Sequence, residues 1–203
     1  MTDIATDKSA LRSLLRQRRN AFVAQMAPLE KRLCFSVIPR PLRTLFDKAT
    51  IIGSYHPTSS EVTTENYHKL FCDIDKIISL PWFSDRQTSM TFRQWSTSNA
   101  LEQGPFDVMQ PSRHAPELSP DLLIVPMLGF DDQGQRLGQG GGHYDRYFAA
   151  NPEAMRIGLA WSVQQHDSIP VEKHDMPLDL VITQEGVITP ATSRLSGDTV
   201  TAI

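Results

Sequence analysis

Four glycines within the stretch RLGQGGGHYDR, residues 136–146, are the feature of this sequence best suited to chemistry. Glycine has no Cβ, so its backbone can approach a ligand closely, and consecutive N–H groups at a helix start form a concavity for phosphate oxygens. Asp145 stands where a Mg²⁺ ion would neutralise charge during phosphoryl transfer. The stretch therefore predicts a phosphate site; a plain surface loop is the alternative that spacing alone leaves open.

Other classes of site lack their signatures in this sequence. The Lys-Ser/Thr pair that closes GxxxxGK[ST] is absent, and the glycine spacing does not give GxGxxG at the start of a first βαβ unit. No HxxxH or HExxH pair indicates zinc, and no GxSxG elbow indicates a serine hydrolase. A phosphate site of another type is therefore expected.

A predicted helix at 7–24 carries charges that could serve the same site. Its basic stripe is Lys8, Arg12, Arg16 and Arg19, and its apolar stripe is Leu11, Leu14, Leu15 and Phe22. Lys8 and Arg12 lie one turn apart and could bind an anion jointly. A solvated charged face is the commoner explanation for such a stripe, and it stays open here.

Glu61 follows the first predicted strand, in SYHPTSSEVTTE. A carboxylate there could accept two parallel hydrogen bonds from an aminopyrimidine. The alternative is a carboxylate placed in the first turn of a helix, where the helix dipole favours it.

The hydrophobic pattern predicts the elements that must position these residues. The predicted helices are 7–24, 28–46 with an interruption at its prolines, 63–71 and 142–149. The predicted strands are 50–55, 76–80, 90–95, 121–125, 156–161 and 178–183. Residues 99–119 are predicted to lack secondary structure and are a candidate active-site flap.

Strands that alternate with helices predict an α/β fold with a mainly parallel sheet covered on both faces. Ligands of such sheets bind beyond the carboxyl ends of the strands. We expect one domain over residues 1–190 and a polar, disordered tail over 191–203.

The composition excludes several partners. The chain has 203 residues and a formal charge of -3 at pH 7, so it has no general attraction for nucleic acid or anionic membranes. The sequence has no run of membrane-spanning length and no secretory signal, and two cysteines are too few for a disulfide framework. We expect a cytoplasmic protein that binds neither nucleic acid nor membrane.

Four motifs in order, KSALR, SEVTT, GFDDQGQRLGQGGGHYDRY and KHDMPLD, make the chain resemble the 5-formyltetrahydrofolate cyclo-ligase family, also called 5,10-methenyltetrahydrofolate synthetase, over residues 8–183. The third motif is long and specific. The resemblance implies a single-domain, three-layer Rossmann-like α/β fold. It also implies an enzyme, a ligase that uses ATP and Mg²⁺ to convert 5-formyltetrahydrofolate to 5,10-methenyltetrahydrofolate, with release of ADP and phosphate. A monomer with a small-molecule folate substrate is expected.

The implied chemistry is physically intelligible. Transfer of a phosphoryl group to the formyl oxygen makes phosphate the leaving group, and folate N10 then attacks the activated carbon and closes the ring. The protein's task is positioning and charge stabilisation. We therefore expect no side-chain nucleophile, and transition-state support from Lys8, Arg12 and Arg136.

The resemblance also implies residue roles. The ATP ligands would be Lys8, Arg12, Arg136, Leu137, Gly138, Gln139, Gly140, Gly141, Gly142, His143 and Tyr144, and Arg146 is added for its charge. The folate contacts would be His56, Glu61, Gln139, Gly140, Gly141, Gly142 and His143. The Mg²⁺ ligands would be Asp145 and Asp175.

Two positions depart from the family's pattern. Many relatives have Tyr in place of His143, and some have Lys in place of Gly141, so phosphate charge must be met by other cations and by backbone. A non-catalytic folate- or nucleotide-binding protein is the alternative function, but binding alone would not require the metal carboxylate Asp145. Kinship with sugar-phosphate isomerases or CoA-transferases would rest on analogy of fold alone.

Overall fold

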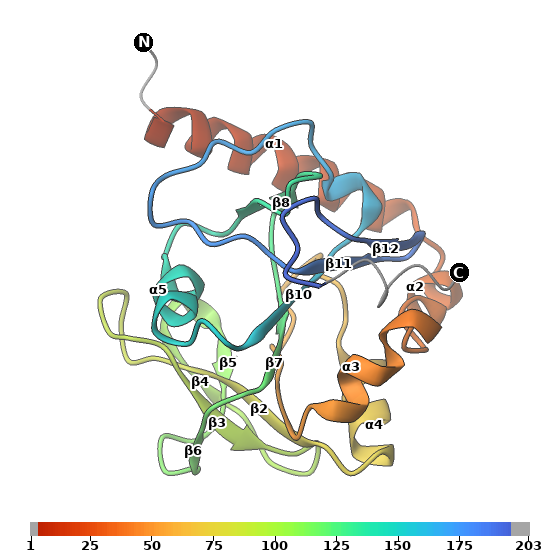
Figure 1. The fold of residues 1–203 in the computed structure, drawn as a ribbon, viewed down its shortest axis with the longest axis vertical. Coiled ribbons are helices and arrows are strands. Elements are labelled where there is room, and N and C mark those ends of the chain that lie inside the picture. Colours follow the sequence, from red (N-terminus) through yellow and green to blue (C-terminus); the bar gives the residue numbers. More distant parts are fainter. Residues whose placement is uncertain (1–3, 196–203) are drawn as a thin grey trace.

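An eight-stranded sheet forms the centre of the computed structural model, which describes residues 4–195 (Figure 1). Its strand order is β12-β11-β10-β7-β1-β2-β3-β6. The five central strands are parallel: β1 (Ile51–Gly53), β2 (Ile77–Trp82), β7 (Leu122–Val125), β10 (Met155–Leu159) and β11 (Leu180–Thr183). Antiparallel strands complete the edges: β12 (Gly186–Ile188), β3 (Thr91–Trp95) and β6 (Glu117–Leu118). The predicted α/β class and mainly parallel sheet are confirmed.

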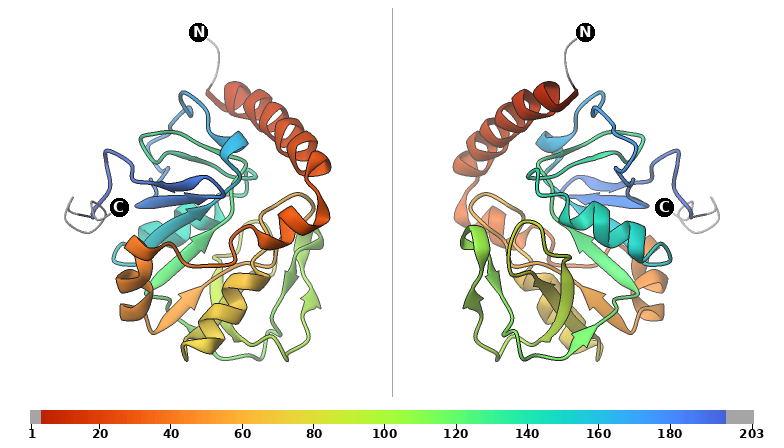
Figure 2. Two further views of the ribbon diagram at one scale, coloured as in Figure 1. Left: turned by 90° about the vertical axis from the view of Figure 1, so that its right-hand side faces the viewer. Right: turned by 90° about the vertical axis from the view of Figure 1, so that its left-hand side faces the viewer.

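The helices are shorter elements between the strands, apart from the first. Their bounds are α1 (Ile4–Gln25), α2 (Pro28–Leu33), α3 (Arg43–Lys48), α4 (Glu65–Asp73) and α5 (His143–Ala150), with 3-10 turns η1 (Arg40–Leu42), η2 (Pro105–Asp107) and η3 (Ser162–Gln164). In Figures 1 and 2, α1 crosses the top of the molecule, and α3 and α4 lie below it. Within residues 4–195, no helix has both the length and the apolar character needed to cross a bilayer.

Each face of the sheet has its own core because side chains alternate along a strand. On β7, Leu122 and Ile124 belong to the core that also holds residues of α3 and α4. Leu123 and Val125 belong to the other, which holds Phe148 of α5. A strand buried on both faces must be apolar throughout, so the run LLIV predicted β7 correctly and predicted layers on both sides.

Two predictions about strands were wrong. We expected a strand at 76–80 that ends before Pro81, but β2 continues through Pro81 to Trp82. The register of the parallel neighbour β1 ends at Ser79, so Pro81 lies beyond it and its missing N–H is not required by that strand. Residues 99–119 are not free of secondary structure: they contain η2, the ladder of β4 (Glu102–Gln103) with β5 (Met109–Gln110), and β6.

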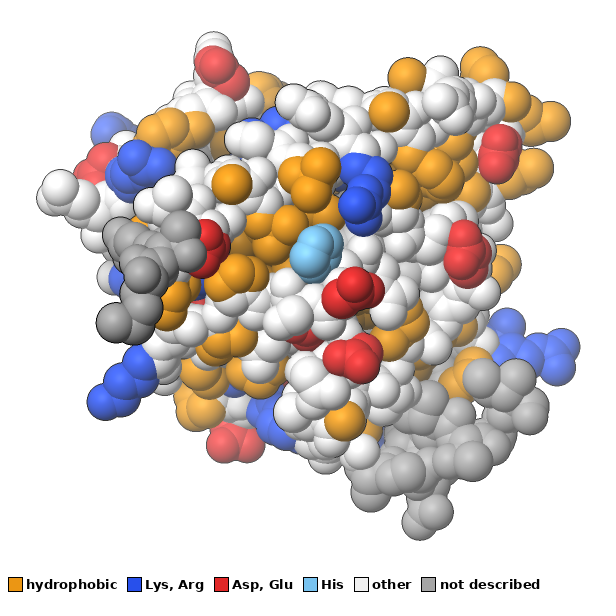
Figure 3. All heavy atoms as spheres, turned by 90° about the horizontal axis from the view of Figure 1, so that it is seen from above, with side chains coloured by type: hydrophobic (Ala, Val, Ile, Leu, Met, Phe, Trp, Pro, Cys, Tyr) orange, Lys and Arg blue, Asp and Glu red, His pale blue; other side chains and the backbone are white. Residues whose placement is uncertain are grey.

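The predicted second helix also ends early. α2 stops at Leu33, and the chain becomes helical again at η1 and α3. Of the predicted tail, residues 196–203 lie outside the described residues. The tail's described part contacts the domain, since Arg194 pairs with buried Asp179 at 2.6 Å. On the face seen from above Figure 1, charges of both signs are scattered among apolar patches (Figure 3).

Candidate active site

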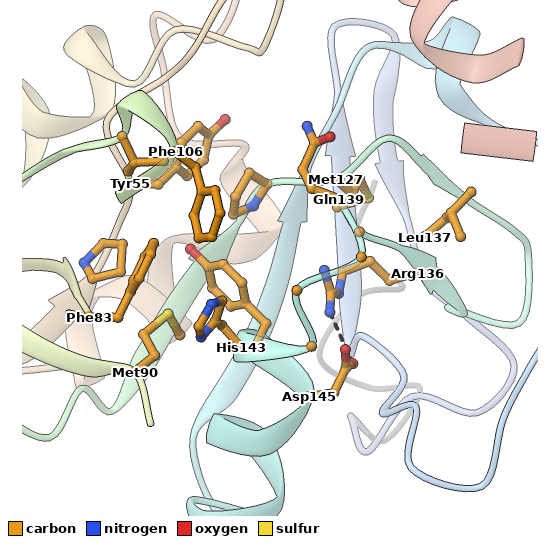
Figure 4. A pocket seen from close by; sticks show the side chains of 18 of the residues that line it. Tyr55, Phe83, Met90, Phe106, Met127, Arg136, Leu137, Gln139, His143 and Asp145 are labelled. Carbon is orange, nitrogen blue, oxygen red and sulfur yellow. Dashed lines mark hydrogen bonds and ion pairs between the residues drawn. The ribbon is translucent and has the colours of Figure 1, made fainter. Parts of the chain in front are cut away.

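A cavity of about 620 Å³ lies beyond the carboxyl ends of β1, β2 and β7. Its walls come from α1, the segments after these three strands, η2, the glycine run and residues 172–175. Figure 4 shows Arg136 and Asp145 on one side, Tyr55, Phe83 and Phe106 on the other, and His143 between them. Segments far apart in the sequence therefore build one site, at the edge of the sheet where the α/β pattern predicted it.

Almost all the predicted site residues line this cavity. They are Lys8, Arg12, His56, Glu61, Arg136, Leu137, Gly138, Gln139, Gly140, Gly141, Gly142, His143, Tyr144, Asp145 and Asp175. The exception is Arg146, whose guanidinium donates to the carbonyls of Gly141 at 3.1 Å and Arg86 at 3.3 Å. Arg146 lines a second, smaller cavity instead, so it contacts the glycine run without lining the main cavity.

The glycine run connects a hairpin to a helix. Strands β8 (Gly129–Phe130) and β9 (Arg136–Leu137) pair around a turn closed by the bond from Gly134 N–H to Asp131 O, 3.1 Å. Gly140 and Gly142 then adopt φ values of +99° and +65°, which favour glycine. The first residues of α5 line the cavity. Because the first N–H groups of a helix have no acceptor within the helix, those of α5 are available to a ligand.

Lys8 reaches the cavity from the first turns of α1. Its ammonium donates to Glu172 Oε2 at 2.7 Å and Asp175 Oδ2 at 2.5 Å, and only 6% of its side chain is exposed. Burial opposes the charged form, but the two carboxylates outweigh it and raise the pKa of Lys8 above its ordinary value. Burial likewise opposes ionisation of Asp175, and the hydrogen bond from Lys8 prevails, so the pKa of Asp175 is lowered.

Arg12 and Arg136 place two further cations beside the glycine run. Arg12 Nε donates to Gly138 O at 3.0 Å. Arg136 Nη2 pairs with Asp145 Oδ1 at 3.0 Å, and its guanidinium lies over the ring of Tyr144, 5.4 Å from the centroid. With Lys8, three cations are fixed around bare backbone, which is a suitable environment for a polyanion.

A group of possible metal ligands lies at residues 172–175. The ligand atoms of Glu172, His174 and Asp175 all lie within 4.8 Å of one another. Asp145 is not part of this group; it pairs with Arg136. Sequence reasoning missed Glu172, although it lies only three residues before Asp175 and beside His174, because an acid in a turn has no distinctive spacing.

The opposite wall is aromatic. The rings of Phe83 and His143 stack at 4.4 Å with an interplanar angle of 22°, and Phe106, 62% exposed, lies 6.4 Å from Phe83. Burial, with the nearby charge of Arg146, lowers the pKa of His143 and so favours its neutral ring. Trp161, which follows strand β10, takes no part in this wall because it is fully buried in the core. This wall suits a flat, uncharged ring system.

Glu61 provides a carboxylate beside that wall. Its Oε2 accepts hydrogen bonds from Thr58 N at 2.9 Å and Thr58 Oγ1 at 3.0 Å, and its Oε1 lies 3.8 Å from Arg19 Nη1. Arg19 is only 2% exposed. Sequence analysis placed Arg19 in a basic stripe and gave it no role; its spacing from Lys8, 11 residues or about three helical turns, was the available signal that both face the same side.

Comparisons with known proteins identify a family, similar sequences and a similar fold. A model of the 5-formyltetrahydrofolate cyclo-ligase family matches residues 4–184. The chain is 33% identical to 5-formyltetrahydrofolate cyclo-ligase of Haemophilus influenzae over 64% of this chain and 74% of that protein. It is 28% identical to the mouse protein of the same name over 88% and 94% of the two chains. An NMR structure of Aquifex aeolicus 5,10-methenyltetrahydrofolate synthetase superposes with a TM-score of 0.74, at 25% identity, over 93% and 95% of the chains.

Proposed function

The chain belongs to the 5-formyltetrahydrofolate cyclo-ligase family and is an enzyme of the ligase class; from this premise we propose that it converts 5-formyltetrahydrofolate to 5,10-methenyltetrahydrofolate with ATP and Mg²⁺, releasing ADP and phosphate. One observation carries the proposal. A single cavity combines a cationic, glycine-lined side with an aromatic side (Figure 4), and the Glu61 carboxylate lines the same cavity. A triphosphate and a pterin ring can then meet inside it.

The cationic side fits a nucleotide phosphate. Within residues 4–195, the buried Nε of Arg136 and hydroxyl of Tyr144 have no hydrogen-bond partner, and buried polar atoms rarely stay unsatisfied. Both residues line the cavity. Gly140 has φ +99°, a conformation that glycine adopts readily, so this bend of the cradle depends on a glycine. We assign ATP binding to Lys8, Arg12, Arg136 and the run up to Tyr144.

When bound, ATP supplies the phosphoryl group that turns the formyl oxygen into a leaving group. The N10 lone pair then forms a bond to the formyl carbon, the bond from that carbon to the phosphorylated oxygen breaks, phosphate departs with the electron pair, and the N10 proton is lost. No side chain needs to act as a nucleophile. Lys8, Arg12 and Arg136 stabilise the negative charge that moves between oxygens, and the cavity walls hold N10 near the carbon.

The donor set at 172–175 also fits a magnesium ion, because Mg²⁺ prefers carboxylate oxygens. We assign Asp175 as a ligand, with Glu172 as its neighbour, and we assign Asp145, which lines the same cavity outside this group, as a second ligand. In the free protein, Lys8 and Arg136 neutralise these carboxylates. Phosphate oxygens would compete for the same two cations and so release carboxylate oxygens to the metal.

The aromatic side fits the folate. We assign His56, Glu61 and the segment from Gln139 to His143 as its contacts, because all of them line the cavity. Within residues 4–195, Glu61 Oε1 accepts no hydrogen bond and lies 3.8 Å from Arg19 Nη1, so it can accept a hydrogen bond from an aminopyrimidine edge. We further propose a monomeric cytoplasmic enzyme, with the charge of -3 favouring neither nucleic acid nor membrane partners.

The test is an absorbance assay for the methenyl product with purified protein, 5-formyltetrahydrofolate, ATP and Mg²⁺. We expect product only when all three are present, with ADP and phosphate formed in equal amounts. Tight folate binding without product would overturn the proposal and favour the non-catalytic alternative. Product formed without ATP would refute the phosphorylation step alone.

A further inference from the structure

The guanidinium of Arg19 lies buried behind the folate side of the cavity, and it does not line the cavity itself. Its Nε donates to Ser60 Oγ at 3.0 Å, and its Nη1 donates to Met127 O at 3.2 Å. The same Nη1 lies 3.8 Å from Glu61 Oε1. One side chain of α1 is therefore joined to the loop after β1 and to the end of β7.

Burial of this cation has a cost that packing alone does not justify. A buried charge is unfavourable unless it is paired, and replacing a buried ion pair by apolar groups is often neutral or stabilising. The neighbouring buried position on the same helix is apolar Leu15. An apolar side chain at position 19 would therefore serve for attachment of the helix, and the guanidinium needs another explanation.

That explanation is the geometry of Glu61. Thr58 fixes one oxygen of its carboxylate from within its own loop. Arg19 opposes the other oxygen from α1 and also holds Ser60, the residue before Glu61. Ser60 is fixed in turn, because its hydroxyl donates to Asn20 Oδ1 and its carbonyl accepts from Trp161 Nε1. The carboxylate is thus held from two sides, with its open part toward the cavity.

We propose that Arg19 is a positioning residue for the folate: it orients the Glu61 carboxylate from behind and thereby sets the affinity for an aminopyrimidine ring without touching either substrate. The inference rests on the proposed function. It also assigns separate tasks along one helix, because Lys8 and Arg12 face the phosphate side while Arg19 supports the folate side.

The experiment compares Arg19→Met with Arg18→Met, a matched control at an exposed position of the same helix. Arg19→Met should raise the Kd for 5-formyltetrahydrofolate by about 10-fold to 100-fold. This is the range for loss of one hydrogen bond from the folate to the charged Glu61 carboxylate. The Kd for an ATP analogue and kcat at saturating folate should change by less than about threefold, since the phosphate side is not touched. Arg18→Met should leave all three values unchanged.

A double-mutant cycle shows whether Arg19 acts through Glu61. In a Glu61→Gln background, Arg19→Met should add less than about twofold to the folate Kd. The same factor in both backgrounds, or equal weakening of folate and ATP analogue, would overturn the inference and return Arg19 to a purely structural role. Arg19→Lys keeps the charge in a smaller change and should weaken folate binding less than Arg19→Met; an unaltered Kd in both, with the variants folded, also overturns it. If the unaltered protein does not bind 5-formyltetrahydrofolate, the proposed function fails first and the inference with it.

Discussion

Substitution of alanine for Gly140 should weaken nucleotide binding selectively. Gly140 has φ +99°, and a Cβ there would lie 3.4 Å from Arg12 Cζ and 3.5 Å from Nε, the atom that donates to Gly138 O. A non-glycine residue in such a conformation costs about 1–3 kcal/mol. The free loop relieves that strain by changing its backbone path, which moves its N–H groups away from the phosphate position, so up to the same free energy is lost from ATP binding, a factor of about 5–150.

Calorimetric titration of Gly140→Ala with a non-hydrolysable ATP analogue and, separately, with 5-formyltetrahydrofolate measures this effect. Gly186→Ala is a matched control, because Gly186 also has a positive φ, +153°, but its Cβ would meet nothing within 4 Å. We expect weaker analogue binding in Gly140→Ala alone. Unchanged analogue affinity in Gly140→Ala, or an equal loss in Gly186→Ala, would refute the cradle argument.

Three further predictions concern buried ionisable side chains. Asp145→Asn leaves buried Arg136 without its ion pair, so the free energy of unfolding should fall by about 1–3 kcal/mol in thermal unfolding, and the Mg²⁺ concentration for half-maximal turnover should rise; an unchanged Mg²⁺ requirement removes Asp145 from the metal site. Lys8→Met should raise the KM for ATP about tenfold or more, with the folate Kd unchanged in titration; an equal loss for both ligands contradicts the phosphate role. Burial, with the charge of nearby His56, lowers the pKa of His68 to about 4. The unfolded chain therefore binds a proton at this residue near pH 6.5, and the folded chain binds it only near pH 4. The free energy of unfolding is full above pH 6.5 and should fall by about 3 kcal/mol between pH 7 and pH 4. Urea unfolding at both pH values should show this loss in the unaltered protein and not in His68→Gln, and equal pH dependence in the two contradicts it.

The strands and helices that the sequence predicted are those long enough to show a hydrophobic pattern. The run LLIV is apolar throughout and LVIT is apolar up to its final threonine, and both form strands buried on both faces, β7 and β11. β6 and β4 have two residues each, too few to show alternation. Their pairing depends on neighbours distant in sequence, such as β3 for β6, so local pattern could not predict them.

The site follows the same division. The glycine run was predictable because its residue types leave backbone bare. Lys8, Arg12 and Glu61 were candidates from residue type and spacing, and the resemblance gave them roles and added Asp175. Arg146 was assigned from its charge alone, and charge does not predict where a side chain points. Its guanidinium donates to the carbonyl of Gly141 and does not line the main cavity. Arg19 was missed for the converse reason, because a cation is expected in solvent unless a partner is known.

In the long helix α1, the sequence did not reveal which side chains point into the protein. Its predicted apolar stripe includes Leu14, which is 47% exposed, whereas its three buried residues are Lys8, Leu15 and Arg19. A helix normally packs through apolar contacts; α1 does so through Leu15 and Phe22, but it also buries two cations whose partners belong to segments that build the cavity. Because an unpaired buried charge is costly, this arrangement is stable only with the carboxylates of Asp175 and Glu61 in place. The attachment of α1 and the electrostatics of the site are therefore one property, and substitutions along this helix should change ligand affinity before they change the fold.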